Sequence, residues 1–376
     1  MLLKTILLNN YRNYTKANLL CSPTLNIIWG NNAQGKSNLL EAIYLLSTGQ
    51  AYRTNHDQEL VRWGASYYLI KSEIQNNERT LDIELMYQID QKKSLKIDGY
   101  KRSRISDVLG VFNVVLFSPD DLYLVKGGPT RRRRYLDLTI CRLNPSYYYY
   151  LQQYQKTVEQ RNQLLRSLAI TTSSLATLEV WDQQLVILGA KILGRRLQIL
   201  PKLTKLSSYF YRKIASNTEQ LFVRYQSTVN LPLENQEIDC SESTIARYFS
   251  DHLKHIRKEE RKRGVTLIGP HRDDLVLYLD QHEMRNFGSQ GQQRSAALSL
   301  KLAELEILAN EQGDYPVLLL DDVLSELDSS RREFLFTQLL NKVQTFLTTT
   351  QYTYLNAEIL KKASLIEVKN GVLWPT

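Results

Sequence analysis

Residues 25–48 read LNIIWGNNAQGKSNLLEAIYLLST: a short apolar segment, a loop rich in glycine and amide side chains, and a second, longer apolar-periodic segment. The loop Gly30–Ser37 matches the pattern GxxxxGK[ST] at each fixed position. A strand entering such a loop and a helix leaving it are the context that identifies a phosphate-binding P-loop. The glycines let the backbone turn tightly, so that amide N–H groups converge on phosphate oxygens near a positive helix N-terminus. The stretch therefore predicts an α/β nucleotide-binding fold.

Each position of this loop has an expected role. The backbone of six residues would hold the phosphates of ATP: Gly30, Asn31, Asn32, Ala33, Gln34 and Gly35. Lys36 would reach the β- and γ-phosphates as a catalytic residue, and the hydroxyl of Ser37 would bind Mg²⁺. A chance glycine-rich turn is the alternative, and the flanking strand and helix argue against it.

A second acidic element supports the nucleotide site. Residues 317–320 form the apolar run VLLL, which leads directly into Asp321 and Asp322. A buried parallel strand that delivers a carboxylate at its C-terminal end is the Walker B arrangement. Asp321 would bind Mg²⁺, and Asp322 would polarise the attacking water. A capped strand end with solvated acids is the alternative, and it is weak beside a P-loop.

A third element narrows the class. The segment SQGQQR at 289–294 precedes a predicted helix near 289–312, where Ser289 can cap the helix and Gly291 allows close approach. With the P-loop before it and the Walker B strand and Ser325–Asp328 after it, its order is that of the ABC-type ATPase motifs. Ser289, Gly291 and Gln292 would then close over ATP held by a second copy. In isolation the segment would be only a polar helix cap.

The whole chain is of ordinary globular composition. It has 376 residues, 43% of them hydrophobic and 23% charged, and a formal net charge of +9. Its three cysteines, Cys21, Cys141 and Cys240, are scattered, which excludes a disulfide scaffold or zinc ribbon. No apolar run reaches the roughly 18 residues of a membrane span, and the N-terminal MLLKTILL is too short for a signal core. We therefore expect a cytoplasmic protein with no membrane partner.

The pattern along the chain predicts an α/β head interrupted by an insertion. Residues 1–117 and 265–376 alternate strands and helices, with an antiparallel β subdomain near 67–101. Residues 118–264 are mostly helical by period and form the predicted arm. The arm carries 24 basic and 14 acidic residues, a net +10 that exceeds the charge of the whole chain. An anionic partner would therefore first be sought there.

Several further strings resemble the RecF family of bacterial recombination mediators. They are NYRNY at 10–14, SPDDL at 118–122, KGGP at 126–129, GPHRDD at 269–274, FGSQGQQR at 287–294 and LDDVLSELD at 320–328. The resemblance covers the chain from end to end. It implies an SMC-like, ABC-type ATPase head with a short helical arm, ATP-dependent homodimers, and slow DNA-stimulated ATP hydrolysis. It also implies binding to single-stranded, gapped and double-stranded DNA, the SOS response, and work with RecR and RecO in loading a recombinase at gaps.

Three positions depart from the wider ABC pattern. Asp322 stands where many ABC ATPases have glutamate, so a shorter side chain must act as base or use a bridging water. The last histidine of the chain is His282, so the segment TTT at 348–350 offers no switch-loop histidine. The segment 118–122 holds no glutamine for a Q-loop. These departures favour a switch or timer over a fast motor.

Basic and aromatic runs give weaker indications. The four residues Arg131, Arg132, Arg133 and Arg134 are candidates for contact with DNA phosphates. The alternative is a solvated helix start, since only about two of four consecutive residues can share one helix face. Tyr147–Tyr150 is more typical of packing than of base stacking. His271 and Asp273 are interpreted as part of a structural loop or a link to the 289–294 segment.

Three other functions are alternatives to a RecF-like ATPase that acts on DNA. A transporter-type ATPase subunit predicts an LSGGQ-type motif, a switch histidine and a shorter insertion than the about 250 residues between Ser37 and Ser289. A structural SMC-like protein predicts hundreds of heptad residues, which the sequence lacks. An ATP-gated binding module without turnover is distinguishable only by kinetics.

Overall fold

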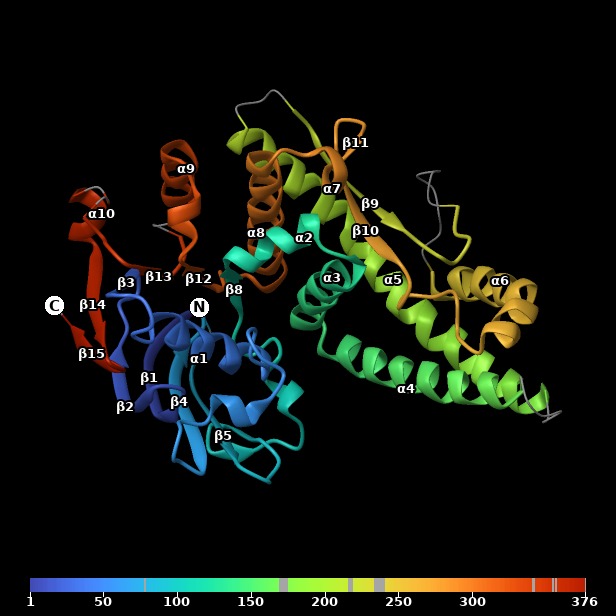
Figure 1. Cartoon of the computed structure of the whole chain (residues 1–376), viewed down its shortest axis with the longest axis horizontal. Helices are drawn as coiled ribbons and strands as arrows, with labels where there is room; N and C mark the ends of the chain where they lie inside the picture. The colour runs from blue at the N-terminus through green and yellow to red at the C-terminus, as the bar shows by residue number, and fades with distance from the viewer. Residues whose placement is uncertain are drawn as a thin grey trace. The chain divides into compact units, whose positions relative to one another are not determined.

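The chain forms two compact units in the computed structural model, which describes residues 1–77, 79–168, 175–215, 219–232, 241–339, 342–353, 355 and 357–375. The first unit is Met1–Asp121 together with Lys301–Thr376, and the second is Leu122–Leu300 (Figure 1). Cys240, one of the three cysteines, lies outside the described residues. Helices and strands alternate in the first unit, so the α/β class predicted from the sequence is confirmed.

A mainly parallel sheet forms the nucleotide-binding part of the first unit. Its strand order is β15-β14-β3-β13-β12-β8, and only β15 runs antiparallel to its neighbour. The strands are β3 (Leu25–Trp29), β8 (Val114–Phe117), β12 (Val317–Asp321), β13 (Thr345–Thr349), β14 (Ala363–Lys369) and β15 (Val372–Pro375). The three central strands are buried nearly throughout, which explains their continuous apolar runs. Helix α1 (Lys36–Thr48) contacts β8, β12 and β13 and is itself almost wholly buried.

A six-stranded antiparallel sheet completes the first unit, in the order β2-β1-β4-β5-β6-β7. Its strands are β1 (Leu2–Tyr11), β2 (Tyr14–Leu20), β4 (Tyr67–Gln75), β5 (Thr80–Gln88), β6 (Ser94–Ile97) and β7 (Tyr100–Lys101). Buried residues alternate with more exposed ones along β4, as expected for a sheet with one face on the core. The sequence placed this subdomain near 67–101, and the structure adds β1 and β2 to the same sheet.

Short helices connect these strands. The α-helices are α9 (Ser329–Leu339) and α10 (Ala357–Lys361), and the 3₁₀ turns are η1 (Asp57–Leu60), η2 (Ile105–Val108), η3 (Pro119–Leu122) and η4 (Val323–Glu326). The turn η4 carries the segment that follows the Walker B strand, and α9 leads from it toward β13.

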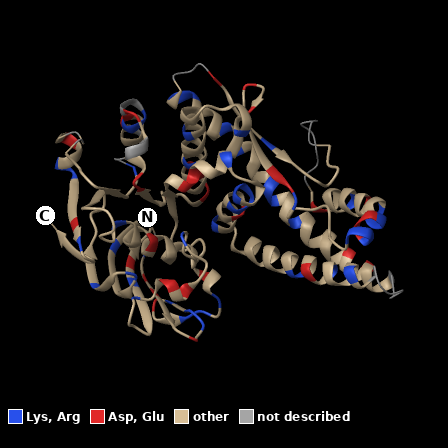
Figure 2. Cartoon of the chain, viewed as in Figure 1, with Lys and Arg blue, Asp and Glu red and all other residues tan. Residues whose placement is uncertain are grey.

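The second unit consists of helices around a three-stranded sheet, β11-β10-β9. Its helices are α2 (Tyr123–Lys126), α3 (Pro129–Leu143), α4 (Pro145–Leu168), α5 (Leu175–Ile214), α6 (Glu242–Arg263), α7 (Met284–Phe287) and the part of α8 (Gln290–Gln312) up to Leu300. Its strands are β9 (Leu221–Gln226), β10 (Asp274–Leu279) and β11 (His282–Glu283). Helices α4 and α5 run side by side, and α6 packs on α5 (Figure 1). In Figure 2 the ribbon of these helices carries blue Lys and Arg positions interspersed with red Asp and Glu positions.

The C-terminal boundary of this unit differs from the arm boundary predicted at Gly264. Strand β10 pairs in antiparallel register with β9, from Asp274 opposite Gln226 to Leu279 opposite Leu221. This pairing joins the chain after Gly264 to the insertion, and the boundary falls at Leu300, inside α8. Charge and helical period could not reveal it, because strand pairing links residues far apart in sequence.

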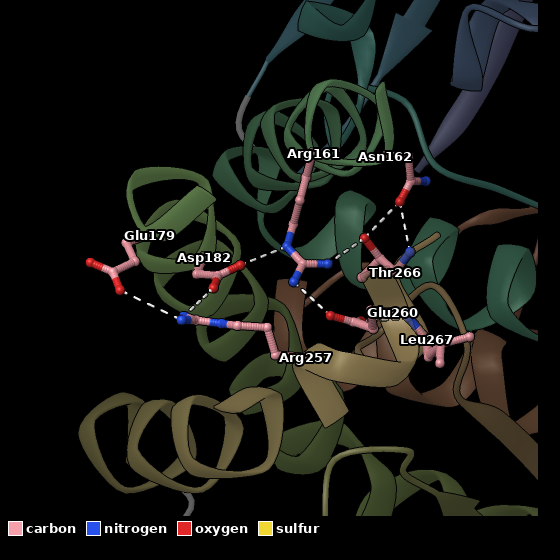
Figure 3. Close-up of polar contacts among 8 residues, drawn as sticks. All are labelled: Arg161, Asn162, Glu179, Asp182, Arg257, Glu260, Thr266 and Leu267. Carbon is pink, nitrogen blue, oxygen red and sulfur yellow. Dashed lines mark hydrogen bonds and ion pairs between the residues drawn. The ribbon is translucent and has the colours of Figure 1, made fainter. Parts of the chain in front are cut away.

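A buried arginine joins three helices of the second unit (Figure 3). Arg161 of α4 is fully buried; its Nε donates to Oδ1 of Asp182 on α5 at 2.7 Å, and its Nη2 donates to Oε2 of Glu260 on α6 at 2.6 Å. Its Nη1 donates to Thr266 Oγ1 at 2.9 Å. Arg257 donates to the second oxygen of Asp182 at 2.7 Å. The charges are paired by short hydrogen bonds, so the network holds α4, α5 and α6 in one arrangement.

Helix α5 is 40 residues long and contains Pro201. A proline has no amide N–H, so one hydrogen bond of the helix is missing at this point. The helix also carries Arg196, whose guanidinium is buried and donates to both oxygens of Asp137 on α3 at 2.9 Å each. None of the helices in the described part of the chain is long and apolar enough to cross a membrane.

Candidate functional site

The loop predicted to bind phosphate lies between β3 and α1, as the sequence indicated. Gly30 has a φ of 143°, and a Cβ atom there would approach the carbonyl oxygen of Val368 to 2.5 Å. Gly35 has a φ of 121°, and its Cβ would approach Asn13 Nδ2 to 2.7 Å. Both positions therefore require glycine for backbone conformation and for space.

The side chain of Lys36 folds back over the loop. Its Nζ donates to the carbonyl oxygens of Gly30 at 2.7 Å and Asn31 at 2.8 Å. Burial lowers the pKa of Lys36, while the nearby carboxylates of Asp322 and Asp321 act in the opposite direction. The ammonium is thus held beside the loop where the β- and γ-phosphates of a nucleotide are expected.

Asp321 is surrounded by hydroxyl groups. Ser37 Oγ donates to its Oδ1 at 2.7 Å, Thr348 Oγ1 donates to the same oxygen at 2.9 Å, and Tyr52 OH donates to its Oδ2 at 2.7 Å. Burial raises the pKa of Tyr52 and the Asp321 carboxylate raises it further, so the phenol keeps its proton. A carboxylate and a serine hydroxyl in contact form a hard-oxygen donor set of the kind that suits Mg²⁺. The structure thus brings together the two predicted metal residues, Ser37 and Asp321.

Asp322 takes a conformation that is uncommon for a residue with a side chain. Its φ is 53° and its ψ is 21°, in the left-handed region, and its side chain is exposed. Its N–H donates to Thr348 Oγ1 at 2.9 Å. Thr348 belongs to the segment TTT at 348–350, in which the sequence offered no switch-loop histidine. Its hydroxyl contacts both acidic residues: it donates to the carboxylate of Asp321 and accepts from the N–H of Asp322.

Asn13 supports the loop in a way that sequence reasoning missed. Its Nδ2 donates to the carbonyl oxygen of Gln34 at 2.7 Å, and its Oδ1 accepts from Asn38 Nδ2 at 2.8 Å. The N–H of Gly371 donates to the same Gln34 carbonyl at 3.1 Å. Arg12, the residue before Asn13, has a φ of 51° in the tight turn between β1 and β2. In the sequence, only the string NYRNY at 10–14 could have indicated this role for Asn13. Its polar residues Arg12 and Asn13 lie between two strands, where a turn can present a side chain.

The segment 289–294 begins α8 in the second unit. Ser289 Oγ accepts from the N–H of Gln292 at 3.3 Å, and Gln292 Oε1 accepts from the N–H of Ser289 at 2.7 Å. This reciprocal pair is a capping box, which confirms the predicted helix start. Ser289 is exposed, and Gly291 and Gln292 are partly exposed.

The GPHRDD segment is held by buried polar contacts. Asp273 is fully buried and accepts from Tyr225 OH at 2.8 Å and from both the N–H and the hydroxyl of Thr228 at 2.6 Å. Tyr154 OH lies 2.9 Å from Nδ1 of His271, and burial lowers the pKa of His271 to about 4. These contacts support the structural interpretation of the segment. In the run 147–150, Tyr147 is fully buried, in agreement with the packing interpretation, whereas Tyr149 is exposed.

The four candidate arginines of α3 have different environments. Arg132 is buried and donates to both oxygens of Asp274, at 2.8 and 2.7 Å, so its predicted contact with DNA is wrong. Arg133 is half-buried and donates to the carbonyl oxygen of Asp273 at 2.8 Å. Arg131 and Arg134 are exposed, and Arg131 lies 5.4 Å from the ring centre of Tyr123. Helical geometry separates the run, because successive residues lie about 100° apart around the axis.

Known proteins resemble the chain over its whole length. A profile described as RecF/RecN/SMC N terminal domain matches residues 2–372. "DNA replication and repair protein RecF" of Bacillus cereus strain B4264 is 42% identical over 374 residues, which are 99% of this chain and 98% of the relative. The protein of the same name from Halothermothrix orenii strain H 168 is 42% identical over 375 residues, again 99% and 98% of the two chains.

Solved structures agree with this relationship. A structure of "the recombination mediator protein RecF-ATP in RecFOR pathway" matches with a TM-score of 0.91 and 35% identity, covering 100% of this chain and 97% of that one. An SMC head bound to the C-winged helix domain of ScpA matches with a TM-score of 0.58 and 16% identity over 100% and 97% of the chains, which shows a shared fold alone. The chain therefore belongs to the RecF family, within the wider RecF/RecN/SMC N-terminal domain family.

Proposed function

We propose that this chain is an ATPase of DNA replication and repair whose ATP site is completed by a second copy of the chain. The observation that carries the proposal is the pairing of the P-loop with the Walker B strand: Ser37 Oγ contacts Asp321 Oδ1 at 2.7 Å, although the two residues are 284 positions apart in sequence. Membership of the RecF family, with ATP-bound relatives, supports ATP as the nucleotide.

The P-loop residues would bind the nucleotide by exchanging partners. The ammonium of Lys36 would leave the carbonyl oxygens of Gly30 and Asn31 and take phosphate oxygens instead, retaining its charge in a buried position. The hydroxyl of Ser37 and the carboxylate of Asp321 would hold Mg²⁺. The ion, when bound, would supply charge neutralisation on the phosphate oxygens. Asn13 and Gly371 would keep the loop shape by holding the Gln34 carbonyl.

Asp322 would orient and polarise the attacking water. Its left-handed backbone and exposed carboxylate place it just after the strand that ends in Asp321. An aspartate is one methylene shorter than the glutamate of many ABC ATPases, so a bridging water would make up the distance. This geometry favours slow hydrolysis. Slow hydrolysis suits the timed release of a dimer from DNA better than it suits a fast motor.

Ser289, Gly291 and Gln292 would meet the ATP held by the other copy. They lie at the N-terminus of the 23-residue helix α8, where amide groups and the helix dipole favour negative charge. Ser289 would act on the γ-phosphate in trans, so ATP would drive formation of the homodimer and hydrolysis would end it.

The DNA role follows from the family and from the arm. The relatives are named for DNA replication and repair and for a recombination mediator in the RecFOR pathway. We propose that the dimer clamps single-stranded, gapped or double-stranded DNA in the cytoplasm, works with RecO- and RecR-type proteins, and helps load the recombinase, including in the SOS response. DNA would stimulate the ATPase, and the exposed Arg131 and Arg134 of the arm would contact phosphates.

The test measures ATP hydrolysis and sedimentation with and without gapped DNA. Lys36→Met should lose ATP-driven dimers, because it removes the phosphate-binding ammonium. Ser289→Arg should still bind ATP but fail to dimerise, because only the contact with the second copy is blocked. Normal dimers and hydrolysis by Ser289→Arg would show that the composite site is wrong.

A further inference from the structure

The carboxamide of Gln292 is engaged at both ends. Its Oε1 accepts from the N–H of Ser289 at 2.7 Å, and its Nε2 donates to Oε1 of Glu219 at 2.6 Å. Glu219 stands two residues before β9, 73 positions earlier in the chain, and no motif marks it. A residue outside the ABC-type motifs therefore contacts a side chain inside one of them.

Glu219 is itself held in place. The hydroxyl of Tyr211 on α5 donates to Oε2 of Glu219 at 3.0 Å, and Tyr211 is fully buried. The next residue, Gln220, exchanges two hydrogen bonds with Asp280 of the β10–β11 turn: its N–H reaches Oδ1 at 3.1 Å, and its carbonyl accepts from the Asp280 N–H at 2.9 Å. The carboxylate of Glu219 and the backbone of the next residue, Gln220, are thus held in place before any ligand arrives.

The chemistry of the two groups gives this contact a direction. A carboxylate can only accept hydrogen bonds, whereas a carboxamide has one accepting and one donating end. Glu219 therefore requires that Nε2 of Gln292 faces it, and this leaves Oε1 toward the N–H of Ser289. Without Glu219, Nε2 would lose its acceptor, and only the Ser289 N–H would hold the carboxamide.

We propose that Glu219 is a positioning residue for the 289–294 segment: it fixes the orientation of the Gln292 carboxamide and, through it, the start of α8. Tyr211 extends this contact to helix α5 of the arm. The inference rests on the proposed function, since it assumes that Ser289 and Gln292 meet nucleotide on a second copy.

The experiment measures the ATP concentration that gives half-maximal dimers in sedimentation, with the full chain and Mg²⁺. Glu219→Ala should raise this concentration by about three- to tenfold, which is the size expected for the net loss of one ordinary hydrogen bond. Glu219→Gln should stay near wild type, because its side-chain oxygen can still accept from Gln292 Nε2. Binding of a fluorescent ATP analogue by dilute single chains separates this effect from a change at the P-loop, which should not follow from Glu219→Ala.

Two controls make the result specific. Gln155 and Glu159 on α4 form a similar glutamine–glutamate hydrogen bond at 3.2 Å on an exposed surface, so Glu159→Ala removes a matched contact away from the 289–294 segment. We expect Glu159→Ala to leave dimer formation unchanged. Hydrogen exchange of peptides covering 284–300 should be faster in Glu219→Ala and unchanged in Glu159→Ala.

Different failures identify different errors. If Ser289→Arg still dimerises, the proposed composite site is wrong. If Ser289→Arg fails to dimerise while Glu219→Ala matches wild type, the positioning role is wrong. Stronger dimers in Glu219→Ala, or a Glu219→Gln variant as weak as Glu219→Ala, would mean that the charge of Glu219 acts on the site and not its orientation of Gln292, and would also overturn the inference.

Discussion

Replacing Arg161 by methionine would test how firmly the helices of the second unit are joined. Methionine is a long apolar side chain, so the change removes the charge and the hydrogen bonds to Asp182, Glu260 and Thr266 but fills much of the space. Asp182 would keep Arg257 at 2.7 Å. Among the residues drawn in Figure 3, Glu260 would keep the N–H of Leu267, at 2.8 Å.

The magnitude follows from what is left behind. Removing one partner of a buried ion pair typically costs about 3–5 kcal/mol, because the other charge stays desolvated. Since Arg257 still neutralises Asp182, we place Arg161→Met at the lower end, about 3 kcal/mol. In a double variant, Arg161→Met with Glu260→Met, the unpaired charge is gone and the remaining cost is mainly the Leu267 N–H. The double variant should therefore be more stable than Arg161→Met alone.

Hydrogen exchange of peptides from α4 and α6 measures this locally, which matters because a chain of two units need not unfold in one step. A loss of about 3 kcal/mol speeds exchange of the protected amides about 100-fold, at about 1.4 kcal/mol per tenfold change. Lys254→Met is the matched control, since Lys254 pairs with Asp251 at 3.7 Å on the exposed surface of α6. Equal exchange in Arg161→Met and Lys254→Met would show that the buried arginine does not hold α4 and α6 together.

Three further predictions concern one or two side chains each. Tyr52→Phe removes a hydrogen bond to the buried Asp321 carboxylate and should lower the free energy of unfolding by about 1.5–3 kcal/mol in urea titrations; no change would contradict the geometry. Burial lowers the pKa of His271 to about 4, so the unfolded chain binds the proton better and stability is lost as pH falls from about 6.5 to 4. At pH 5 this loss is about 2 kcal/mol, and His271→Gln should show a correspondingly smaller drop in melting temperature between pH 7.5 and 5. Neutralising Arg131 and Arg134 should reduce the salt slope of DNA binding by about 1–2, and an unchanged slope would remove them from the interface.

The nucleotide-binding elements were predictable because their signals are local. A glycine pattern, an apolar strand and a following helix occupy Gly30–Ser37 and its immediate neighbours, and the Walker B strand ends in its acid within one short run. The partners of these elements were not predictable. Tyr52 and Thr348 reach Asp321 from other segments, and a tyrosine or threonine alone carries no signal for such a contact.

The same distinction explains the errors. The arginine run of α3 was visible in sequence, but the burial of Arg132 depends on Asp274, 142 positions away. The boundary at Gly264 followed helical period and charge, whereas the structure extends the unit through the pairing of β10 with β9. Glu219 had no pattern of its own, and only the fold reveals its contact with Gln292.

Pro201 divides α5 into two parts with different contacts. Asp182 and Arg196 lie before it and are anchored in buried ion pairs, whereas Tyr211 lies after it and reaches Glu219. The helix is about 60 Å long at 1.5 Å per residue. The part before Pro201 cannot move along the helix axis without breaking ion pairs. A force on the arm would therefore bend the helix most easily at Pro201, where a hydrogen bond is missing. Such a joint would change the angle of the short C-terminal piece, and Tyr211 and Glu219 would pass a small tilt there to the Gln292 carboxamide.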